Sequence, residues 1–331
     1  MMKVFNKKYA LILTAALLFG TIITASVVDA AVITNSVVKL GIYSYGNLIY
    51  SGVGLQYVPT GGDAITPGCY CEGWGAADLN TSKSGYANQS SGTANLTVES
   101  FTSTSDSAIS IVRVVVGGVD IMRVTHNYRP SASSNLYEGL VTIENLTSSS
   151  INLRYRRNMD WDVPPTTFSE LTTVITGGSP YVTYSDDNGF TSSNPLTTSS
   201  PILFTGEAVD SGPGDHGALF DFGLGTLSPG ASINFFIYYG AAANHSEAMT
   251  ALNTLGIGVF SLGKPSNTSD GSPNTFIFGF KPGYIISPSI SNIEGTTATI
   301  TGDFTTRGTT TVTVDGITAT VKSVSSKEIT V

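Results

Sequence analysis

The segment RYRRNMDWD, residues 154–162, gathers charged side chains that could bind or transform a ligand. Six of the seven arginines of the chain fall between residues 113 and 157, and three of them lie in this segment. In a β-strand alternate side chains point to the same face, so Arg154, Arg156, Asp160 and Asp162 would lie together. They could bind the hydroxyl or acidic groups of a ligand, or pair with one another as a cross-strand ladder on an exposed sheet.

The two tryptophans are the second class of candidate binding residue. Trp74 and Trp161 stand beside glycine and aspartate residues. An aromatic face suits the apolar side of a sugar ring, although core packing claims many tryptophans in β-proteins. The sequence-based ligand-binding set is therefore Arg154, Arg156, Asp160, Trp161, Asp162 and Trp74.

A short acidic loop is the candidate metal site. Asp186, Asp187 and Asn188 precede Gly189, and oxygen ligands on a flexible loop suit Ca²⁺. The same residue types are also common in plain turns, and no twelve-residue EF-hand pattern is present. Calcium is the one cofactor considered, and none is required by the sequence.

Acidic residues elsewhere could serve a hydrolase. The stretch GPGDHGALFD supplies Asp215 and His216 as acid–base or metal-ligating candidates. A glycosidase needs two carboxylates facing each other across a cleft, and Asp160, Asp162, Glu170 and Asp215 could provide them. The sequence has no G-x-S-x-G nucleophile elbow and no H-E-x-x-H motif. No catalytic residue is therefore assigned, and the sequence favours a protein that is not an enzyme; if it is one, a glycoside-active hydrolase is expected.

The N-terminus predicts export. Residues 1–30 hold three lysines, an apolar run from Tyr9 to Val28 and a small-residue pattern that predicts cleavage after Ala30. The run is long enough that a retained membrane anchor is the alternative. We expect a secreted or cell-surface protein without membrane contact after cleavage. The remaining chain has a net charge near −10 and no basic tract, which argues against nucleic acid as a partner.

The only two cysteines lie in PGCYCEGWG, residues 67–75. Outside the cytosol two neighbouring thiols should oxidise, so we predict a Cys69–Cys71 disulfide. In a regular strand these Cα atoms would be about 6.6–6.8 Å apart, at the limit for a disulfide, and the backbone should be kinked. Six N-x-S/T sequons permit glycosylation, but a chain this rich in Ser and Thr contains about that many by chance.

The elements that must position these residues are mostly strands. SAISIVRVVV and VDIMRVTHNY flank Gly117 and Gly118, which predicts a two-residue hairpin. LYEGLVTIEN with INLRYRRNMDWDV, and GALFDFGLGTL with ASINFFIYYGAA, predict two further strand pairs joined by polar turns. One helix is predicted at about residues 244–255, with Asn244 as its N-cap and Gly256 as its stop.

The C-terminal segment resembles a known module. Its pieces ISPSISNIEG, ATITGDF, TVTVDGITATV and VSSKEITV are similar to an IPT/TIG domain, an immunoglobulin-like β-sandwich, over residues 286–331. The chain stops before the closing strands of that family, which predicts a partial module with an open edge. Either the chain belongs to a longer array, or a strand of another subunit completes the sandwich and builds a filament.

The larger part resembles a second group of proteins. PGCYCEGWG, NLYEGLVTIEN, RYRRNMDWDV, DNGF, GDHGALFDFG and NTFIFGF are similar to an uncharacterised secreted β-domain of bacterial and archaeal surface proteins, over most of residues 40–283. The resemblance implies location and architecture and no established activity.

The sequence therefore predicts an all-β protein: a signal peptide at 1–30, a large β-sandwich with one accessory helix at 31–283, and a partial Ig-like domain at 286–331. The expected function is a non-catalytic extracellular or cell-surface structural or adhesion protein. Its expected partners are extracellular glycans or proteins, or further copies of itself through the open β-edge. The alternatives are a carbohydrate-active protein that binds or hydrolyses glycans, and a self-assembling filament subunit.

Overall fold

The computed structural model describes residues 29–286, together with 289–294, 297–301, 312–314, 317–319, 323–324 and 328–330. Most of the predicted signal peptide thus lies outside the described residues. The first strand begins at Ala30, which the sequence placed last in the signal peptide. No helix of the described residues is long and apolar enough to cross a membrane.

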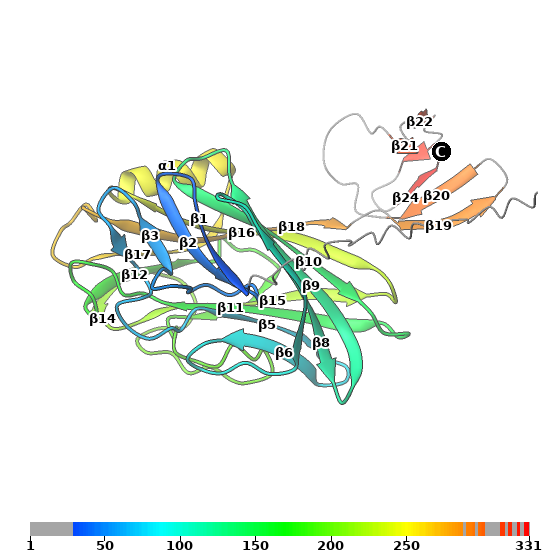
Figure 1. Ribbon diagram of the computed structural model, residues 1–331, viewed down its shortest axis with the longest axis horizontal. Helices are drawn as coiled ribbons and strands as arrows, with labels where there is room; N and C mark the ends of the chain where they lie inside the picture. The colour runs from blue at the N-terminus through cyan, green and yellow to red at the C-terminus, as the bar shows by residue number, and fades with distance from the viewer. Residues whose placement is uncertain are drawn as a thin grey trace, which may run out of the picture.

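Two large antiparallel sheets form the body of the protein (Figure 1). The nine-stranded sheet has, in spatial order, β14 (Ala208–Gly214), β12 (Glu170–Ile175), β17 (Val259–Pro265), β18 (Thr275–Ile286), β16 (Ser232–Ala242), β10 (Leu136–Asn145), β9 (Val119–Pro130), β8 (Ala108–Val116) and β7 (Leu96–Ser103). The five-stranded sheet has β13 (Val182–Asp186), β15 (Gly217–Leu227), β11 (Ile151–Asp160), β5 (Gly73–Asp78) and β6 (Lys83–Asn88). The predicted all-β sandwich is confirmed.

The two sheets share one apolar core. Phe220 and Phe222 of β15 contact Phe280 of β18, with ring centroids 5.0 and 4.7 Å apart, and Tyr155 of β11 meets Phe235 of β16 edge-on at 5.0 Å. A smaller sheet of β1 (Ala30–Thr34), β2 (Val38–Tyr43), β3 (Leu55–Tyr57) and β4 (Gly62–Asp63) adds its buried residues to the same core. Burial of aromatic and branched side chains is the main stabilising contribution to such a sandwich.

A buried ion pair lies inside this core. Arg157 points to the face of β11 opposite Arg156 and is fully buried. Its Nε donates to Oε1 of Glu72 at 2.6 Å, and the hydroxyl of Tyr239 donates to the same oxygen. A buried charge without such partners would be strongly destabilising, so this network has a structural role.

In the part of the chain that the structure describes, the single helix is α1 (His245–Leu255), as predicted. The side chain of Asn244 accepts a hydrogen bond from the Glu247 amide, and Gly256 ends the helix with φ of 63°. Its buried residues Ala248 and Leu252 pack in a second apolar cluster with β16 and β18. The predicted cap and stop residues are confirmed.

The strand pairs are only partly as predicted. β8 and β9 form the expected hairpin, and Gly117 and Gly118 have φ of 61° and 80° at its turn. In contrast, β10 and β11 do not pair with each other, because β10 belongs to the nine-stranded sheet and β11 to the five-stranded one. The same holds for β16 and β15. These turns carry the chain from one sheet to the other.

The C-terminal segment contains short antiparallel strands. They are β19 (Ser289–Glu294), β20 (Thr297–Thr301), β24 (Glu328–Thr330) and β23 (Ser323–Val324) in one sheet, and β21 (Val312–Val314) with β22 (Ile317–Ala319) in another. Within the segment TVTVDGITATV, β21 and β22 pair antiparallel, with Val314 opposite Ile317. The IPT/TIG resemblance and the domain boundaries stay predictions.

Candidate active site

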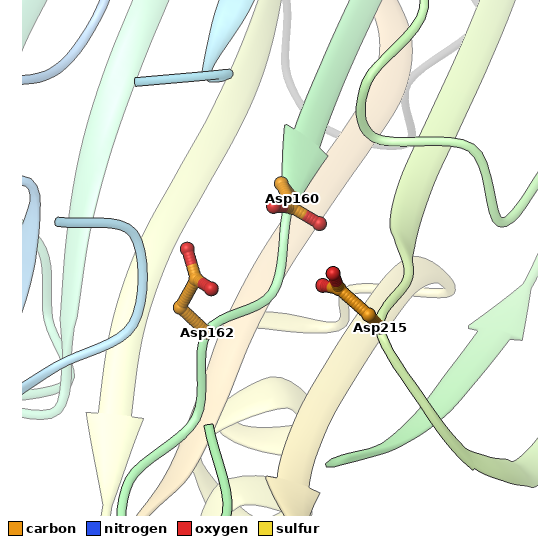
Figure 2. A group of neighbouring side chains, drawn as sticks. All are labelled: Asp160, Asp162 and Asp215. Atoms are coloured by element: carbon orange, nitrogen blue, oxygen red, sulfur yellow. The ribbon is translucent and has the colours of Figure 1, made fainter. Parts of the chain in front are cut away.

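Three aspartates from two distant parts of the chain lie close together (Figure 2). Asp160 is the last residue of β11, Asp162 follows it by two residues, and Asp215 lies between β14 and β15. One carboxylate oxygen of each lies within 4.8 Å of those of the other two. We refer to Asp160, Asp162, Asp215 and the adjacent Glu170 as the carboxyl cluster.

Strand register explains why these residues meet. Asp160 is paired with Gly217, the first residue of β15, and Asp215 stands two residues before that pair. Glu170, the first residue of β12, is paired with Gly214, the last residue of β14. Asp215 follows Gly214 directly, so the same crossing between sheets brings it close to both acids. The four residues of the carboxyl cluster are those predicted from the sequence as possible glycosidase carboxylates, and the structure brings them together.

The aspartates differ in their access to solvent. Asp160 is 1% exposed and Asp162 is fully buried, whereas Asp215 is exposed on the solvent side. The Oδ1 atoms of Asp160 and Asp162 are buried without a hydrogen-bond partner. Among the described residues, no lysine or arginine forms an ion pair with any of the three. Buried polar atoms are normally paired, so these oxygens are available to a proton or a ligand.

The carboxyl cluster therefore holds protons at neutral pH. The pKa of Asp160 is raised to about 9, mainly by burial and in smaller part by the neighbouring carboxylates of Asp162, Asp215 and Glu170. Burial is also the largest cause that raises the pKa of Asp162 to about 7 and that of Glu170 to about 8. The pKa of Asp215 is raised by burial as well. Neighbouring carboxyl groups with different pKa values are the arrangement that acid–base catalysis uses.

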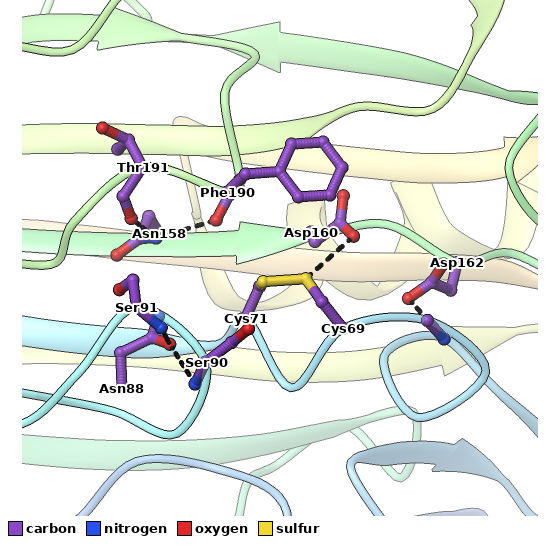
Figure 3. The surroundings of a disulfide bond; sticks show 12 residues. Cys69, Cys71, Asn88, Ser90, Ser91, Asn158, Asp160, Asp162, Phe190 and Thr191 are labelled. Atoms are coloured by element: carbon purple, nitrogen blue, oxygen red, sulfur yellow. Dashed lines mark hydrogen bonds between the residues drawn. A yellow bond between two sulfur atoms is a disulfide. The ribbon is translucent and has the colours of Figure 1, made fainter.

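The predicted disulfide lies beside Asp160 of this cluster (Figure 3). Cys69 and Cys71 are bonded with their Cα atoms 5.2 Å apart, shorter than a regular strand allows, so the predicted kink is confirmed. The Sγ of Cys69 lies 3.4 Å from Oδ2 of Asp160. Because a disulfide sulfur carries no hydrogen, only a protonated Asp160 can donate in this contact, in agreement with its raised pKa.

The disulfide loop also holds Asp162. The amide of Gly68 donates to Oδ2 of Asp162 at 3.1 Å. A Cβ atom at position 68 would lie 2.4 Å from Oδ1 of the same carboxyl group, so glycine is required for this close approach. The loop thus fixes the two buried aspartates of the carboxyl cluster from one side.

The predicted calcium loop has its oxygens engaged. Oδ1 and Oδ2 of Asp187 accept from the amides of Ile202 and Leu203, each at 2.8 Å, and Oδ2 also contacts Nδ1 of His216 at 3.0 Å. Asp186 accepts from the Tyr184 hydroxyl and the Asn188 amide. Asp186, Asp187 and Asn188 thus organise the loop that follows β13. Calcium binding at these residues stays a prediction. Among the described residues, the side chains close enough together to bind a metal ion are those of Asp160, Asp162 and Asp215.

The arginines lie at the other end of the same strand face. Arg156 is buried and forms a fork with Asp221, its Nε and Nη2 donating at 2.7 Å each. Its remaining hydrogen bonds go to the segment 192–197, so the pair is covered and is not an exposed ladder. Arg154 is half-buried beside a cavity described below. The ligand-binding prediction thus divides into two separate places.

The prediction of sugar-stacking tryptophans is wrong. Trp74 and Trp161 are both fully buried, and both belong to the main core. The indole of Trp74 donates to the Tyr45 carbonyl and that of Trp161 to the Ser261 hydroxyl. Neither ring presents a face to a ligand: Trp74 of β5 packs against His126 of β9, and Trp161, which follows β11, lies against Gly263 of β17, both in the nine-stranded sheet.

Two exposed aromatic residues near the carboxyl cluster were missed. Tyr70 stands between the two bonded cysteines and is 43% exposed. Phe168 lies two residues before Glu170, is 51% exposed and has a positive φ of 68°. A bulky residue in this conformation is strained, and such strain is concentrated at functional sites. The spacing C-Y-C was visible in the sequence, but the exposure of neither ring was.

The arrangement can do one of two things. A protonated and an ionised carboxyl group this close can donate and accept a proton at a bound substrate, in the manner of glycosidases that use two carboxyl groups. Three carboxylates can alternatively bind a hard divalent cation such as Ca²⁺ through oxygen ligands.

The chain was compared with known protein families, curated proteins and solved structures. No family model and no curated protein matches the chain. Solved structures similar to it include a candidate aldose 1-epimerase from Escherichia coli K12, 9% identical, covering 76% of this chain and 87% of that one, with a TM-score of 0.33. A galactose mutarotase-like protein from Lactobacillus casei ATCC 334 is 11% identical, with coverages of 76% and 87% and a TM-score of 0.34. A galactose mutarotase-related enzyme from Lactobacillus acidophilus is 11% identical, with coverages of 76% and 85% and a TM-score of 0.32.

The expectation of a non-catalytic structural or adhesion protein is corrected: the solved structures to which the chain is similar are named as an aldose 1-epimerase, a galactose mutarotase-like protein and a galactose mutarotase-related enzyme.

Proposed function

We propose that the protein is a carbohydrate-active enzyme that cleaves a glycosidic bond at the carboxyl cluster. The observation that carries the proposal is the approach of Asp160, Asp162 and Asp215 to within 4.8 Å, with unpaired buried oxygens on two of them. Glycosidases that retain configuration hold their two carboxyl groups about 5–5.5 Å apart, which is close to this spacing.

The environments of the three aspartates suggest different roles. Asp215 is the one exposed aspartate of the three, so a substrate can reach it from solvent, and we assign it as the carboxylate that attacks the anomeric carbon. Asp162, with a pKa of about 7, donates its proton to the departing glycosidic oxygen. The resulting glycosyl ester on Asp215 is then attacked by water, whose proton returns to Asp162, and both carboxyl groups regain their starting states.

Asp160 acts as a positioning residue in this scheme. It keeps its own proton at neutral pH, and its carboxyl group contacts the disulfide. A neutral Asp160 adds no second negative charge against Asp162. If Asp160 were ionised, like-charge repulsion would raise the pKa of Asp162 and make it a weaker proton donor to the departing glycosidic oxygen.

The exposed rings of Tyr70 and Phe168 supply the apolar surface that a sugar needs. Both stand within two residues of a side chain that belongs to, or contacts, the carboxyl cluster. Sugar rings stack on such aromatic faces. The export signal predicted at residues 1–30 supports a substrate outside the cytosol, and glycans are the partner class that fits both arguments.

The proposal is tested by assaying the purified protein against a panel of chromogenic glycosides and soluble glycans, with release of reducing ends as the readout. Asp162→Asn and Asp215→Asn should each lower kcat at least about 100-fold, which is the usual contribution of a positioned acid or nucleophile. Asp120→Asn, an aspartate of the surface pair with Arg113, is the matched control and should keep full activity.

The alternative, that the carboxyl cluster binds Ca²⁺, is tested on the same proteins. If Ca²⁺ raises the melting temperature of the wild type, and Asp162→Asn and Asp215→Asn abolish that effect, the carboxyl cluster is a cation site and the proposed acid–base role fails. Absence of hydrolysis across the panel, with folded wild type and no sugar binding by calorimetry, would also overturn the proposal.

A further inference from the structure

A second polar site lies at the start of β11, away from the carboxyl cluster. A cavity of about 230 Å³ opens there, lined among others by Arg154, Arg156, Tyr184, Pro195, Ser199 and Asp221. This volume is below the about 300–1,000 Å³ of pockets for drug-sized ligands, so it suits a single small group.

Arg154 is the unusual member of this lining. The arginines at 113, 123, 129, 156 and 157 each pair with a carboxylate. Among the described residues Arg154 has no such partner: Nη1 donates to the Pro195 carbonyl at 3.3 Å, and Nε is buried without an acceptor. A half-buried guanidinium without a counter-charge is costly, and an anion in the cavity would compensate it.

The neighbouring charges do not neutralise Arg154. Both oxygens of Asp221 accept from Arg156, so that pair is closed upon itself. The cavity therefore carries one uncompensated positive charge on a chain of net charge −8. The negative net charge of the protein repels extended polyanions. A small anion that fits inside the cavity is therefore favoured over a polyanion as its ligand.

We propose that this cavity, the Arg154 pocket, binds the carboxylate of an acidic sugar residue. The guanidinium would donate to the carboxylate, and the hydroxyls of Thr197 and Thr198 at the exposed rim would meet the sugar hydroxyls. The choice of a sugar acid over other carboxylates rests on the proposed function. The site is distinct from the carboxyl cluster.

Two observations separate the two sites. Arg154 and Asp160 are six residues apart on one strand, a distance of about 20 Å at about 3.3 Å per residue. Between them the side chain of Asn158 donates to the carbonyls of Gly189 and Thr191, so the segment after β13 crosses the strand face there. One sugar unit cannot occupy both sites.

The test is isothermal titration of the full chain with glucuronate and galacturonate, and with glucose, galactose, acetate and sulfate as probes. We expect the two uronates to bind, more weakly as NaCl is raised, and the neutral sugars to bind at least 10-fold more weakly at this site. Arg154→Gln should lower uronate affinity about 10- to 100-fold, the usual range for a charge-assisted hydrogen bond. Arg129→Gln, an exposed arginine paired with Glu138, is the control and should bind as wild type.

The remaining outcomes decide between parts of the inference. If Arg154→Gln does not fold, a second variant takes its place. Thr198→Trp blocks the exposed rim of the Arg154 pocket without changing its charge and should abolish uronate binding by itself. Equal affinity for acetate, sulfate and uronates would overturn the sugar part, and uronate binding unaffected by either variant would overturn the site. Asp215→Asn should keep uronate binding, so loss of hydrolysis alone leaves the Arg154 pocket standing.

Discussion

Replacing Asp160 by asparagine should make the folded protein more stable at neutral and alkaline pH. In the native protein burial raises the pKa of Asp160 to about 9, while in the unfolded chain it titrates near its ordinary value. Between these two pKa values the native state holds a proton that the unfolded state has lost. The wild-type protein therefore loses stability as pH rises through this window, and stability is full only below the unfolded pKa.

The size of the effect follows from linkage. Each pH unit within the window corresponds to about 1.4 kcal/mol for one proton, so the three units between pH 4 and pH 7 set a ceiling of about 4 kcal/mol. The asparagine side chain does not titrate in this pH range, and its amide keeps a polar group next to Cys69. Relaxation and water entry reduce such effects, so we expect Asp160→Asn to gain about 1–3 kcal/mol at pH 7.

The assay is chemical denaturation of both proteins from pH 4 to pH 9, with a constant disulfide state checked by intact mass. The stability gap should be close to zero at pH 4 and should widen steadily toward pH 9. A gap that is negative or independent of pH would refute the argument that burial keeps Asp160 protonated.

Asp187→Asn is the matched control with the opposite sign. Asp187 is equally buried, but both of its oxygens accept backbone amides. An amide NH₂ in place of one oxygen would face those donors, so we expect a loss of about 2–4 kcal/mol, given about 1.5–3 kcal/mol for each hydrogen bond to a charged group. The same chemical change should thus stabilise one site and destabilise the other.

Three further predictions follow from the structure. Phe168→Gly should be about 1 kcal/mol more stable than Phe168→Ala by denaturation, because a left-handed residue with a side chain costs about 1–2 kcal/mol, while both should weaken sugar binding in calorimetry. The double change Cys69→Ser, Cys71→Ser should lose only about 1–2 kcal/mol, since the closed loop is short, yet lower activity in the glycoside assay by moving the group that contacts Asp160; an unchanged kcat would contradict its positioning role. Glu72→Gln should lose about 3–5 kcal/mol by leaving Arg157 buried and unpaired, and a smaller loss would show that water reaches the pair.

Local patterns were sufficient for part of the fold and of the site. The Gly117-Gly118 hairpin, the helix capped by Asn244 and the Cys69–Cys71 disulfide depend on residues close in the chain, and all three are present. Alternation along residues 154–162 also placed Arg156 and Asp160 on the face opposite Tyr155, as observed.

Local patterns could not say which strands would be partners or which aromatic residues would be exposed. A polar turn can connect two strands that pair as a hairpin, or two strands that belong to facing sheets. The turn between β10 and β11 connects the two sheets. Trp161, which follows β11, is buried against β17 of the nine-stranded sheet, while Phe168, in the turn before β12, is exposed.

The sequence by itself thus determined the all-β class, the helix, the disulfide and the set of acids from which the candidate site is drawn. Only the tertiary structure decided that Asp160, Asp162, Asp215 and Glu170 lie close together and that Arg154 stands apart from them. The physical reason is that hairpins, caps and short disulfides depend on neighbouring residues. The meeting of β11, β12, β14 and β15, in contrast, depends on two sheets burying apolar faces contributed by residues far apart in the chain.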